Sequence, residues 1–201
     1  MNDNDHISPE VMEKLQYYAR EGIQNAARGF SSMLGQQLNV SNPVFEKVSV
    51  TEISRIVGGP ETEAIGIYLR AEGNVGVQIM LIIPYDKSLE LVDLLMDVPA
   101  GTSTQLGRME RSALAEVGNL TTSFFLNSLS TMTGISIRPT PPAVMVDMVG
   151  AILDIVIATS GDIGDHVLLL QADFMNGDRS VETSFWVIPD TATLEALASK
   201  G

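Results

Sequence analysis

Two long stretches of this chain carry apolar residues at the spacing of one helix face. Between about Pro9 and Leu38, apolar or aromatic side chains recur every three or four residues, which predicts a long amphipathic helix. Ser8 followed by proline is typical of a helix start, and Asn42-Pro43 is expected to end the helix. A second long helix is predicted from about Gln105 to Met132, with Gly134 as its left-handed stop.

The region between the two helices has the alternation and the turn residues of β-structure. Val44 to Ile53 predicts a strand, and residues 64–69 and 75–83 predict a hairpin around Glu72-Gly73-Asn74. Tyr85 to Val98 has the apolar pattern of a short amphipathic helix.

The region after the second helix contains three prolines, at positions 139, 141 and 142, which predict an extended crossing. The pattern that follows predicts a short helix at 145–153, strands at about 155–159, 165–174 and 181–189, a hairpin turn at Asn176-Gly177-Asp178, and a terminal helix at 191–199.

This order of elements occurs twice. Each half has a long helix, a proline, one or two strands, a hairpin and a short helix, and Phe30-Ser-Ser-Met-Leu-Gly35 is similar to Leu129-Ser-Thr-Met-Thr-Gly134. We therefore expect a single domain over residues 1–201, built of two repeats at about 8–100 and 101–200. The expected fold class is α/β (α+β), with pseudo-two-fold symmetry and long helices packed on a mostly antiparallel sheet.

Composition and charge exclude several classes of function. The chain has 201 residues, 45% of them apolar, which is typical of a globular protein. Its formal charge of −13 argues against nucleic acid and anionic membrane surfaces as partners, and is explained either by a solvated acidic surface or by a salty cytoplasm. It has no cysteine and two histidines, so we expect no thiolate chemistry and no metal site. The polar N-terminus and the lack of a long apolar run predict a cytoplasmic protein.

The second long helix carries the candidate chemistry. Leu106, Met109, Ala113, Val117, Leu120 and Phe124 are predicted to form its core stripe, and Ser112, Glu116, Asn119 and Ser123 its exposed polar flank. Gly118 lies in mid-helix, which costs about 1 kcal/mol relative to alanine and indicates a close approach by another group. Thr121-Thr122-Ser123 is expected to add a small-residue surface.

Glu116 and Asn119 are the candidate catalytic residues, because side chains three apart on a helix project side by side. An acid and a carboxamide held on a stiff surface are suited to gripping a partner protein and positioning a water in its active site. An acid and an amide on a solvated flank are also ordinary, so the spacing alone does not establish a function.

The surrounding residues resemble a known family. Ser112-x3-Glu116-x2-Asn119, followed after 21 residues by Pro141, is similar to the signature of the CheC/CheX/FliY family of chemotaxis phosphatases, and CheC is the most similar member. Glu116-Val-Gly-Asn119-Leu, Leu126-Asn-Ser-Leu-Ser130, Thr133-Gly134, Pro139-Thr-Pro-Pro142 and Asp147-Met-Val-Gly-Ala-Ile-Leu153 fit the second half of a CheC protein.

The resemblance implies a CheC-like fold and hydrolysis of the aspartyl phosphate of the response regulator CheY. By resemblance, Asn119 would orient the attacking water and Glu116 would pair with the active-site lysine of CheY. Mg²⁺ would belong to CheY, so no cofactor of the chain's own is expected. For Ser112 and Pro141 we expect structural roles, in helix packing and in chain redirection.

The first half departs from the family pattern. Tyr17 stands where a first-site glutamate belongs and Arg20 where the asparagine belongs, and the nearby Glu21 and Asn25 are four residues apart. We therefore expect the first site to be lost and one Glu/Asn site to remain.

Two other functions stay open at this point. By the same resemblance, the alternative prediction is a non-enzymatic chemotaxis adaptor that regulates the receptor deamidase CheD, or a flagellar switch component. In that case residues 150–154 are the candidate CheD contact, unless they form a buried helix end. A scaffold without catalysis is the third alternative.

Overall fold

The computed structural model describes residues 9–35, 37–73, 76–159 and 166–189. These ranges form five α-helices and seven strands, joined in one place by a short 3-10 turn, η2 (Val50–Glu52). The helices are α1 (Pro9–Leu34), α2 (Ile53–Ile56), α3 (Tyr85–Leu95), α4 (Arg108–Thr133) and α5 (Val149–Thr159). The strands are β1 (Asn39–Ser49), β2 (Glu63–Gly73), β3 (Val77–Pro84), β4 (Ile137–Pro139), β5 (Ala143–Met148), β6 (His166–Asn176) and β7 (Arg179–Pro189).

The strands form one antiparallel sheet in the order β1-β6-β7-β3-β2-β4, and β5 also pairs with β2. The order is symmetric about the central β7–β3 pair, since β6 and β1 lie on one side and β2 and β5 on the other. Each half also lends one strand to the other, because β1 pairs with β6 and β5 pairs with β2. This arrangement is the one that two repeats would produce, although the division into repeats stays a prediction.

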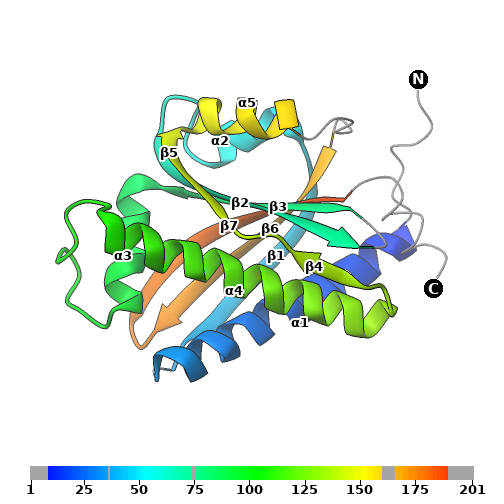
Figure 1. Cartoon of the computed structure of the whole chain (residues 1–201), viewed down its shortest axis with the longest axis horizontal. Helices are drawn as coiled ribbons and strands as arrows, with labels where there is room; N and C mark the ends of the chain where they lie inside the picture. The colour runs from blue at the N-terminus through cyan, green and yellow to red at the C-terminus, as the bar shows by residue number, and fades with distance from the viewer. Residues whose placement is uncertain (1–8, 36, 74–75, 160–165, 190–201) are drawn as a thin grey trace.

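Helices cover both faces of this sheet, as Figure 1 shows. On one face α1, α3 and α4 pack over the inward residues of the strands, including Ile65, Ile67 and Leu69 of β2. On the other face α2 and α5 cover a second core, which contains Trp186 and the alternate strand positions such as Ala64. The alternation of side chains along each strand thus supplies two separate cores. The expected fold class is confirmed: helices pack on a curled antiparallel sheet.

Helix α4 lies directly on β2. Gly118 is buried, and a Cβ atom at this position would lie 2.5 Å from Cγ2 of Ile67. The predicted close approach at Gly118 therefore occurs, but the approaching group belongs to the protein's own sheet.

Helix α1 packs against α4 through two glycines of its own. A Cβ at Gly22 would lie 3.0 Å from Cα of Phe125, and a Cβ at Gly29 would collide with the ring of Phe124. These contacts hold α4 between the sheet on one side and α1 on another, so the helix has a fixed rotation about its axis.

The helical and hairpin predictions are largely confirmed. Helix α4 ends at the left-handed Gly134, whose φ is 67°, and the β2–β3 and β6–β7 pairs lie where they were expected. The predicted end of the first helix at Leu38 is wrong, because α1 ends at Leu34 and Gly35 adopts a φ of 67°. Asn42-Pro43 therefore lies inside β1, at a register shift between Ser41 and Val44.

Two predictions of local structure are wrong. Residues 145–153 do not form one helix: the chain runs as β5 to Met148 and α5 begins at Val149. Residues 155–159 belong to α5 and not to a strand. In both cases a short apolar run fits either structure, and pairing with β2 or packing on the second core decides between them. The predicted terminal helix at 191–199 lies outside the described residues.

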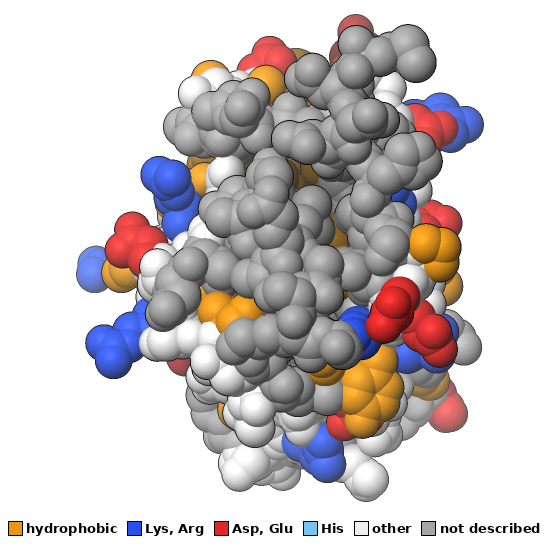
Figure 2. Space-filling view, turned by 90° about the vertical axis from the view of Figure 1, so that its right-hand side faces the viewer, with side chains coloured by type: hydrophobic (Ala, Val, Ile, Leu, Met, Phe, Trp, Pro, Cys, Tyr) orange, Lys and Arg blue, Asp and Glu red, His pale blue; other side chains and the backbone are white. Residues whose placement is uncertain are grey.

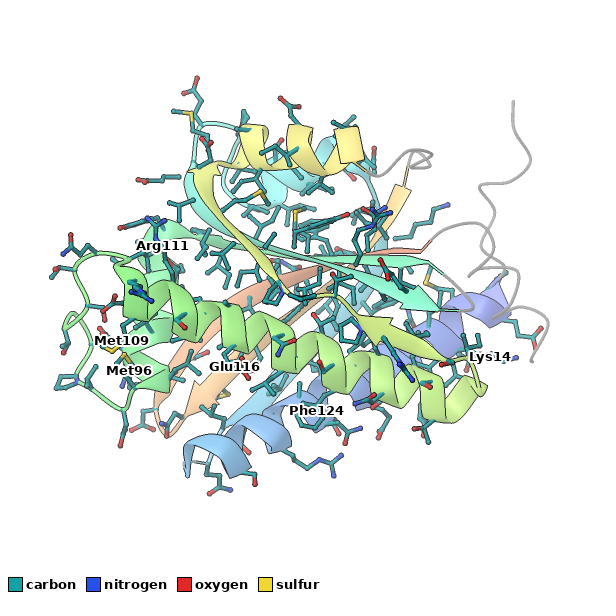
Figure 3. The ribbon with its side chains drawn as sticks, in the orientation of Figure 1. Lys14, Met96, Met109, Arg111, Glu116 and Phe124 are labelled. Carbon is teal, nitrogen blue, oxygen red and sulfur yellow. The ribbon has the colours of Figure 1, made fainter. Side chains whose placement is uncertain are left out.

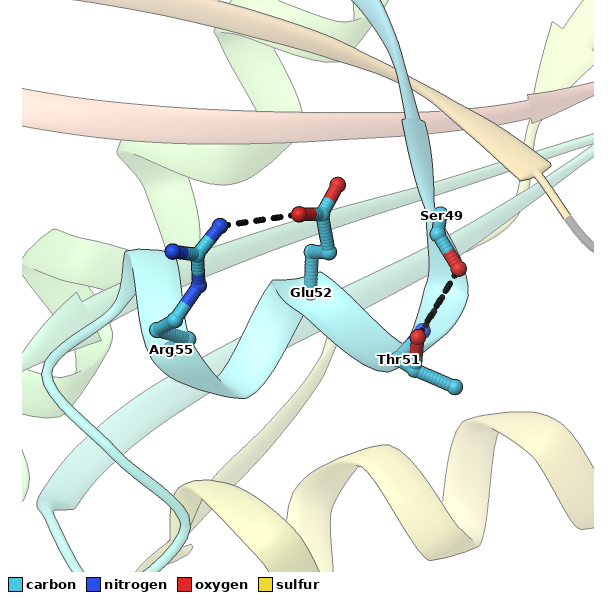
Figure 4. A network of polar contacts seen from close by, with 4 residues as sticks. All are labelled: Ser49, Thr51, Glu52 and Arg55. Carbon is cyan, nitrogen blue, oxygen red and sulfur yellow. Dashed lines mark hydrogen bonds and ion pairs between the residues drawn. The ribbon is translucent and has the colours of Figure 1, made fainter.

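A small polar network joins β1 to α2, shown in Figure 4. The Ser49 hydroxyl accepts a hydrogen bond from the Thr51 backbone N–H at 3.3 Å, which caps the η2 turn. Arg55 pairs with Glu52 at 2.8 Å, one helical turn away. The predicted strand over 44–53 therefore ends four residues early, at Ser49.

No helix in the described part of the chain has the length and apolar content that a membrane span requires.

Candidate functional site

The candidate catalytic residues lie on the exposed side of α4. The buried face of the helix contains Leu114, Val117 and Thr121, and its rotation is set by the contact of Gly118 with the sheet. Glu116 and Asn119 lie about 120–180° around the axis from the centre of that face. Glu116 is exposed and Asn119 is half-buried, so both side chains lie within reach of a partner.

The rest of the predicted polar flank follows the same line. Ser112 is exposed, and Ser123 is half-buried one turn beyond Asn119. No hydrogen bond or ion pair joins the side chain of Glu116 or Asn119 to another residue within 9–35, 37–73, 76–159 or 166–189. The acid and the amide are therefore not consumed by internal structure and are available to bind an external group.

The predicted core stripe of α4 is wrong in part. Met109 was placed in the core but is 60% exposed. Seven residues separate Met109 from the exposed Glu116, so the two side chains leave the helix in directions that differ by only about 20°. Thr121 and Thr122 were placed on the surface but are buried, at 2% and 1% exposure. Helix α1 covers this part of α4, and the sequence pattern of α4 alone carries no information about that contact.

The other two signature positions are placed as follows. Ser112 is exposed one turn before Glu116, so the predicted packing role for Ser112 is not supported. Pro141 is exposed in the link between β4 and β5, where it lines a shallow hollow with Glu72 and Arg138. Its position at the turn between two strands agrees with a role in redirecting the chain.

The positions expected to correspond to a lost first site lie on α1. Tyr17 is 56% exposed and Arg20 is exposed, and neither is an acid or an amide. Asn25 donates a hydrogen bond to the Ser128 hydroxyl at 2.8 Å and accepts one from Arg28. Asn25 therefore helps to join α1 to α4, and α1 presents no exposed Glu/Asn pair of the α4 kind.

The charge of the chain is unevenly distributed. Helix α1 carries three acidic and three basic residues and α4 carries two of each, so neither has a net charge. The formal charge of −13 thus falls on the remainder of the chain. On the side shown in Figure 2, the visible acidic and basic side chains are scattered around the rim without grouping by sign.

A buried carboxylate that the sequence did not single out orders the loop before α4. Asp93 is 1% exposed, and its carboxylate accepts hydrogen bonds from the backbone N–H groups of Thr102 and Ser103 at 3.0 and 2.8 Å. Burial raises the pKa of the Asp93 carboxyl, but hydrogen bonds from the Ser103 hydroxyl and from three backbone N–H groups lower it more, so the pKa lies below its ordinary value. Asp93 has no sequence signal beyond being an acid on the apolar side of a short helix.

The described residues contain no cluster of three or more His, Asp or Glu side chains that would suit a metal ion.

Comparison with known proteins connects this geometry to a family. Residues 109–146 match the model of the CheC-like family, and this segment contains Glu116, Asn119 and Pro141. The chain is 24% identical to the CheY-P phosphatase CheC of Bacillus subtilis, over 95% of this chain and 93% of that protein.

Solved structures give the same result for the fold. FliY of Thermotoga maritima superposes with a TM-score of 0.74 at 16% identity, covering 96% of each chain. CheX in a CheX-CheY-BeF3-Mg+2 complex from Borrelia burgdorferi superposes with a TM-score of 0.50 at 17% identity, covering 85% of this chain and 96% of that one. The resemblance to the CheC/CheX/FliY family is confirmed.

Proposed function

We propose that this chain is a CheC-like phosphatase that hydrolyses the aspartyl phosphate of CheY, with Glu116 and Asn119 as its one catalytic pair. The proposal is supported by a relative that is named a CheY-P phosphatase and by the likeness to a CheX that was solved in complex with CheY. The observation that carries it is the accessible Glu116–Asn119 pair, in which Glu116 is exposed and Asn119 half-buried, without internal partners among the described residues, inside the segment that matches the family.

Asn119 supplies the water-positioning group in this proposal. Its carboxamide has both an acceptor oxygen and a donor nitrogen, so it can hold a water in line with the phosphorus–oxygen bond of the phosphoaspartate. The water oxygen forms a bond to phosphorus while the bond to the aspartyl oxygen breaks, which releases phosphate and a free carboxylate. Phosphoryl transfer of this kind depends mainly on positioning and on charge stabilisation.

Glu116 supplies the docking contact. It is an exposed acid one helical turn from Asn119, and in the proposal it pairs with a lysine at the CheY active site. An ion pair at this distance from Asn119 fixes the position of the carboxamide relative to the phosphoryl group. Because α4 is held by Ile67 and by α1, the pair moves as one rigid unit.

The metal in this proposal belongs to CheY. Phosphoryl groups on carboxylates are commonly held with Mg²⁺, which neutralises charge on the transferring oxygens. This chain contributes the acid and the amide, and the proposed reaction places no cofactor on it.

The test is the decay of phosphorylated CheY in the presence of variants of α4. Asn119→Ala is expected to abolish the accelerated decay, because no other group positions the water, while binding to CheY is kept. Asn127→Ala is the matched control: it removes an exposed asparagine from the same helix, two turns further along, and is expected to leave the rate unchanged. Equal rates for wild type and Asn119→Ala would contradict the assignment.

A second candidate function, binding of a regulatory partner such as the deamidase CheD, is favoured by the surface of α5. Ile155 and Ile157 are 47% and 45% exposed, and Met148 immediately before the helix is 54% exposed. Within the segment 150–154 that the sequence suggested, Ile152 and Leu153 are buried, so any contact there would use the exposed side of α5. A pull-down of CheD with wild type and with Ile157→Asp tests this proposal: equal CheD capture by both would reject it.

A further inference from the structure

The first turn of α4 carries an exposed apolar side chain that the proposed reaction does not use. Met109 is the second residue of the helix and is 60% exposed. Methionine is enriched at protein interfaces relative to the rest of the protein surface. Figure 3 shows Met109 at the end of α4 and Glu116 nearer the middle of the helix.

Met109 lies on the same line along the helix as Glu116. Seven residues advance the helix by about 10 Å and rotate it to within about 20° of its starting direction. Specific protein interfaces bury about 800 Å² on each partner, which corresponds to a disc of about 16 Å radius. A protein that contacts Glu116 and Asn119 at the centre of such an interface therefore also covers Met109.

The first turn of α4 offers a basic side chain to an acidic partner. Arg108, the first residue of α4, is exposed and lies within about 20° of the line of Asn119. An aspartyl phosphate with a bound divalent cation needs carboxylates around it, so the surface that presents it is acidic. The long helices have no net charge, whereas the rest of the chain carries the charge of −13 and repels such a partner.

We propose that Met109 and Arg108 form a second contact for phosphorylated CheY and set the affinity of this chain for it, while Glu116 and Asn119 act on the phosphoryl group. The inference rests on the proposed function and deepens it. Met109 fills an apolar depression on CheY, and Arg108 accelerates the encounter and orients it. Both are positioning residues: they change KM and leave kcat unchanged.

The experiment measures kcat and KM for hydrolysis of phosphorylated CheY, together with the affinity for CheY activated by Mg²⁺ and BeF₃⁻. Met109→Asp is expected to raise KM and Kd by at least about tenfold with kcat unchanged, since it removes the buried apolar area and adds a repulsive charge. Met109→Lys is expected to weaken binding less than Met109→Asp. An acid in the first turn of a helix favours the helix, so folding is expected to be kept, and circular dichroism checks it.

Val44→Asp is the matched control, because it adds the same charge at an apolar residue that is 48% exposed on β1, at the edge of the sheet away from β2 and α4. It is expected to leave kcat and KM unchanged. Arg108→Gln is expected to raise KM and to reduce the dependence of KM on salt, as the loss of an attractive charge requires.

The possible results distinguish failure of the second contact from failure of the proposed function. An unchanged KM and Kd for Met109→Asp, with activity lost in Asn119→Ala, overturns the second contact and leaves the proposed function in place. A wild-type chain that neither binds activated CheY nor accelerates its dephosphorylation overturns both. A shift in the molecular mass of the chain alone on Met109→Asp would show that a second copy of the chain covers this surface, which also overturns the inference.

Discussion

Because Gly118 packs against Ile67, the effect of Gly118→Ala on stability is expected to depend on residue 67. The substitution should destabilise the wild-type chain and stabilise a chain that carries Ile67→Ala. A Cβ at position 118 would lie 2.5 Å from Cγ2 of Ile67, well inside the distance at which two carbon atoms repel. In wild type, Gly118→Ala therefore forces α4 away from β2. Overpacking of this kind costs about 1–3 kcal/mol, while the better helix propensity of alanine returns about 1 kcal/mol. We expect a net loss of up to about 2 kcal/mol in the free energy of unfolding.

The same substitution is expected to stabilise a chain in which Ile67 is already alanine. Ile67→Ala removes Cγ2 and leaves a cavity, at a cost of about 2–5 kcal/mol by itself. Adding Gly118→Ala then fills part of that space and gains helix propensity, so the double variant should be more stable than Ile67→Ala by about 1 kcal/mol. The two substitutions thus have a coupling energy of about 1–3 kcal/mol.

Urea denaturation of the wild type, both single variants and the double variant measures this cycle directly. The dephosphorylation rate of CheY is followed in parallel, because displacement of Asn119 by about 1 Å is expected to lower catalysis by about a hundredfold. A Gly118→Ala variant that is more stable than wild type would refute the packing of α4 on β2. Additive effects in the cycle would refute the direct contact.

Two further predictions concern the elements on either side of α4. Asp93→Asn is expected to lower the free energy of unfolding at pH 7 by about 1–3 kcal/mol. Both carboxylate oxygens of Asp93 accept hydrogen bonds from backbone N–H groups, and in asparagine one of these oxygens is replaced by an NH₂ group that cannot accept. Because the folded-state pKa of Asp93 is depressed, its contribution is fully present above the unfolded pKa of about 3.9 and is lost as the pH falls through the folded pKa. Denaturation curves at pH 3 to 7 should therefore show a shallower loss of stability in acid for Asp93→Asn, and equal slopes for the two chains would contradict this. Gly134→Ala is expected to cost about 1–2 kcal/mol, because Gly134 closes α4 at a φ of 67° with its N–H bonded to the Ser130 carbonyl. Thermal unfolding measures that loss, and an unchanged melting temperature would show that the left-handed cap is unimportant.

The sequence was sufficient for the elements whose signals are local. Gly134 marks the end of α4 and Gly177 marks the β6–β7 turn, because both positions need a positive φ. The sequence was insufficient where packing against another part of the chain decides whether a segment is a helix or a strand. Residues 155–159 are rich in β-branched residues and were expected to form a strand, yet they complete α5 because Val156 packs into the second core.

The candidate site was predictable in part for the same reason. The side-by-side placement of Glu116 and Asn119 follows from helix geometry, and the structure leaves both of them accessible. The rotation of α4 was not predictable, since it depends on Ile67 of β2 and on Gly22 and Gly29 of α1. That contact exposes Met109 and buries Thr121, which is the reverse of what the pattern of α4 alone suggested.

Catalysis by this chain is best tested by the decay of phosphorylated CheY in the presence of a small, substoichiometric amount of the wild-type chain. We expect each molecule of the chain to dephosphorylate many molecules of CheY, with release of free phosphate. A decay rate equal to that of phosphorylated CheY alone, under conditions in which the two proteins bind, would contradict it.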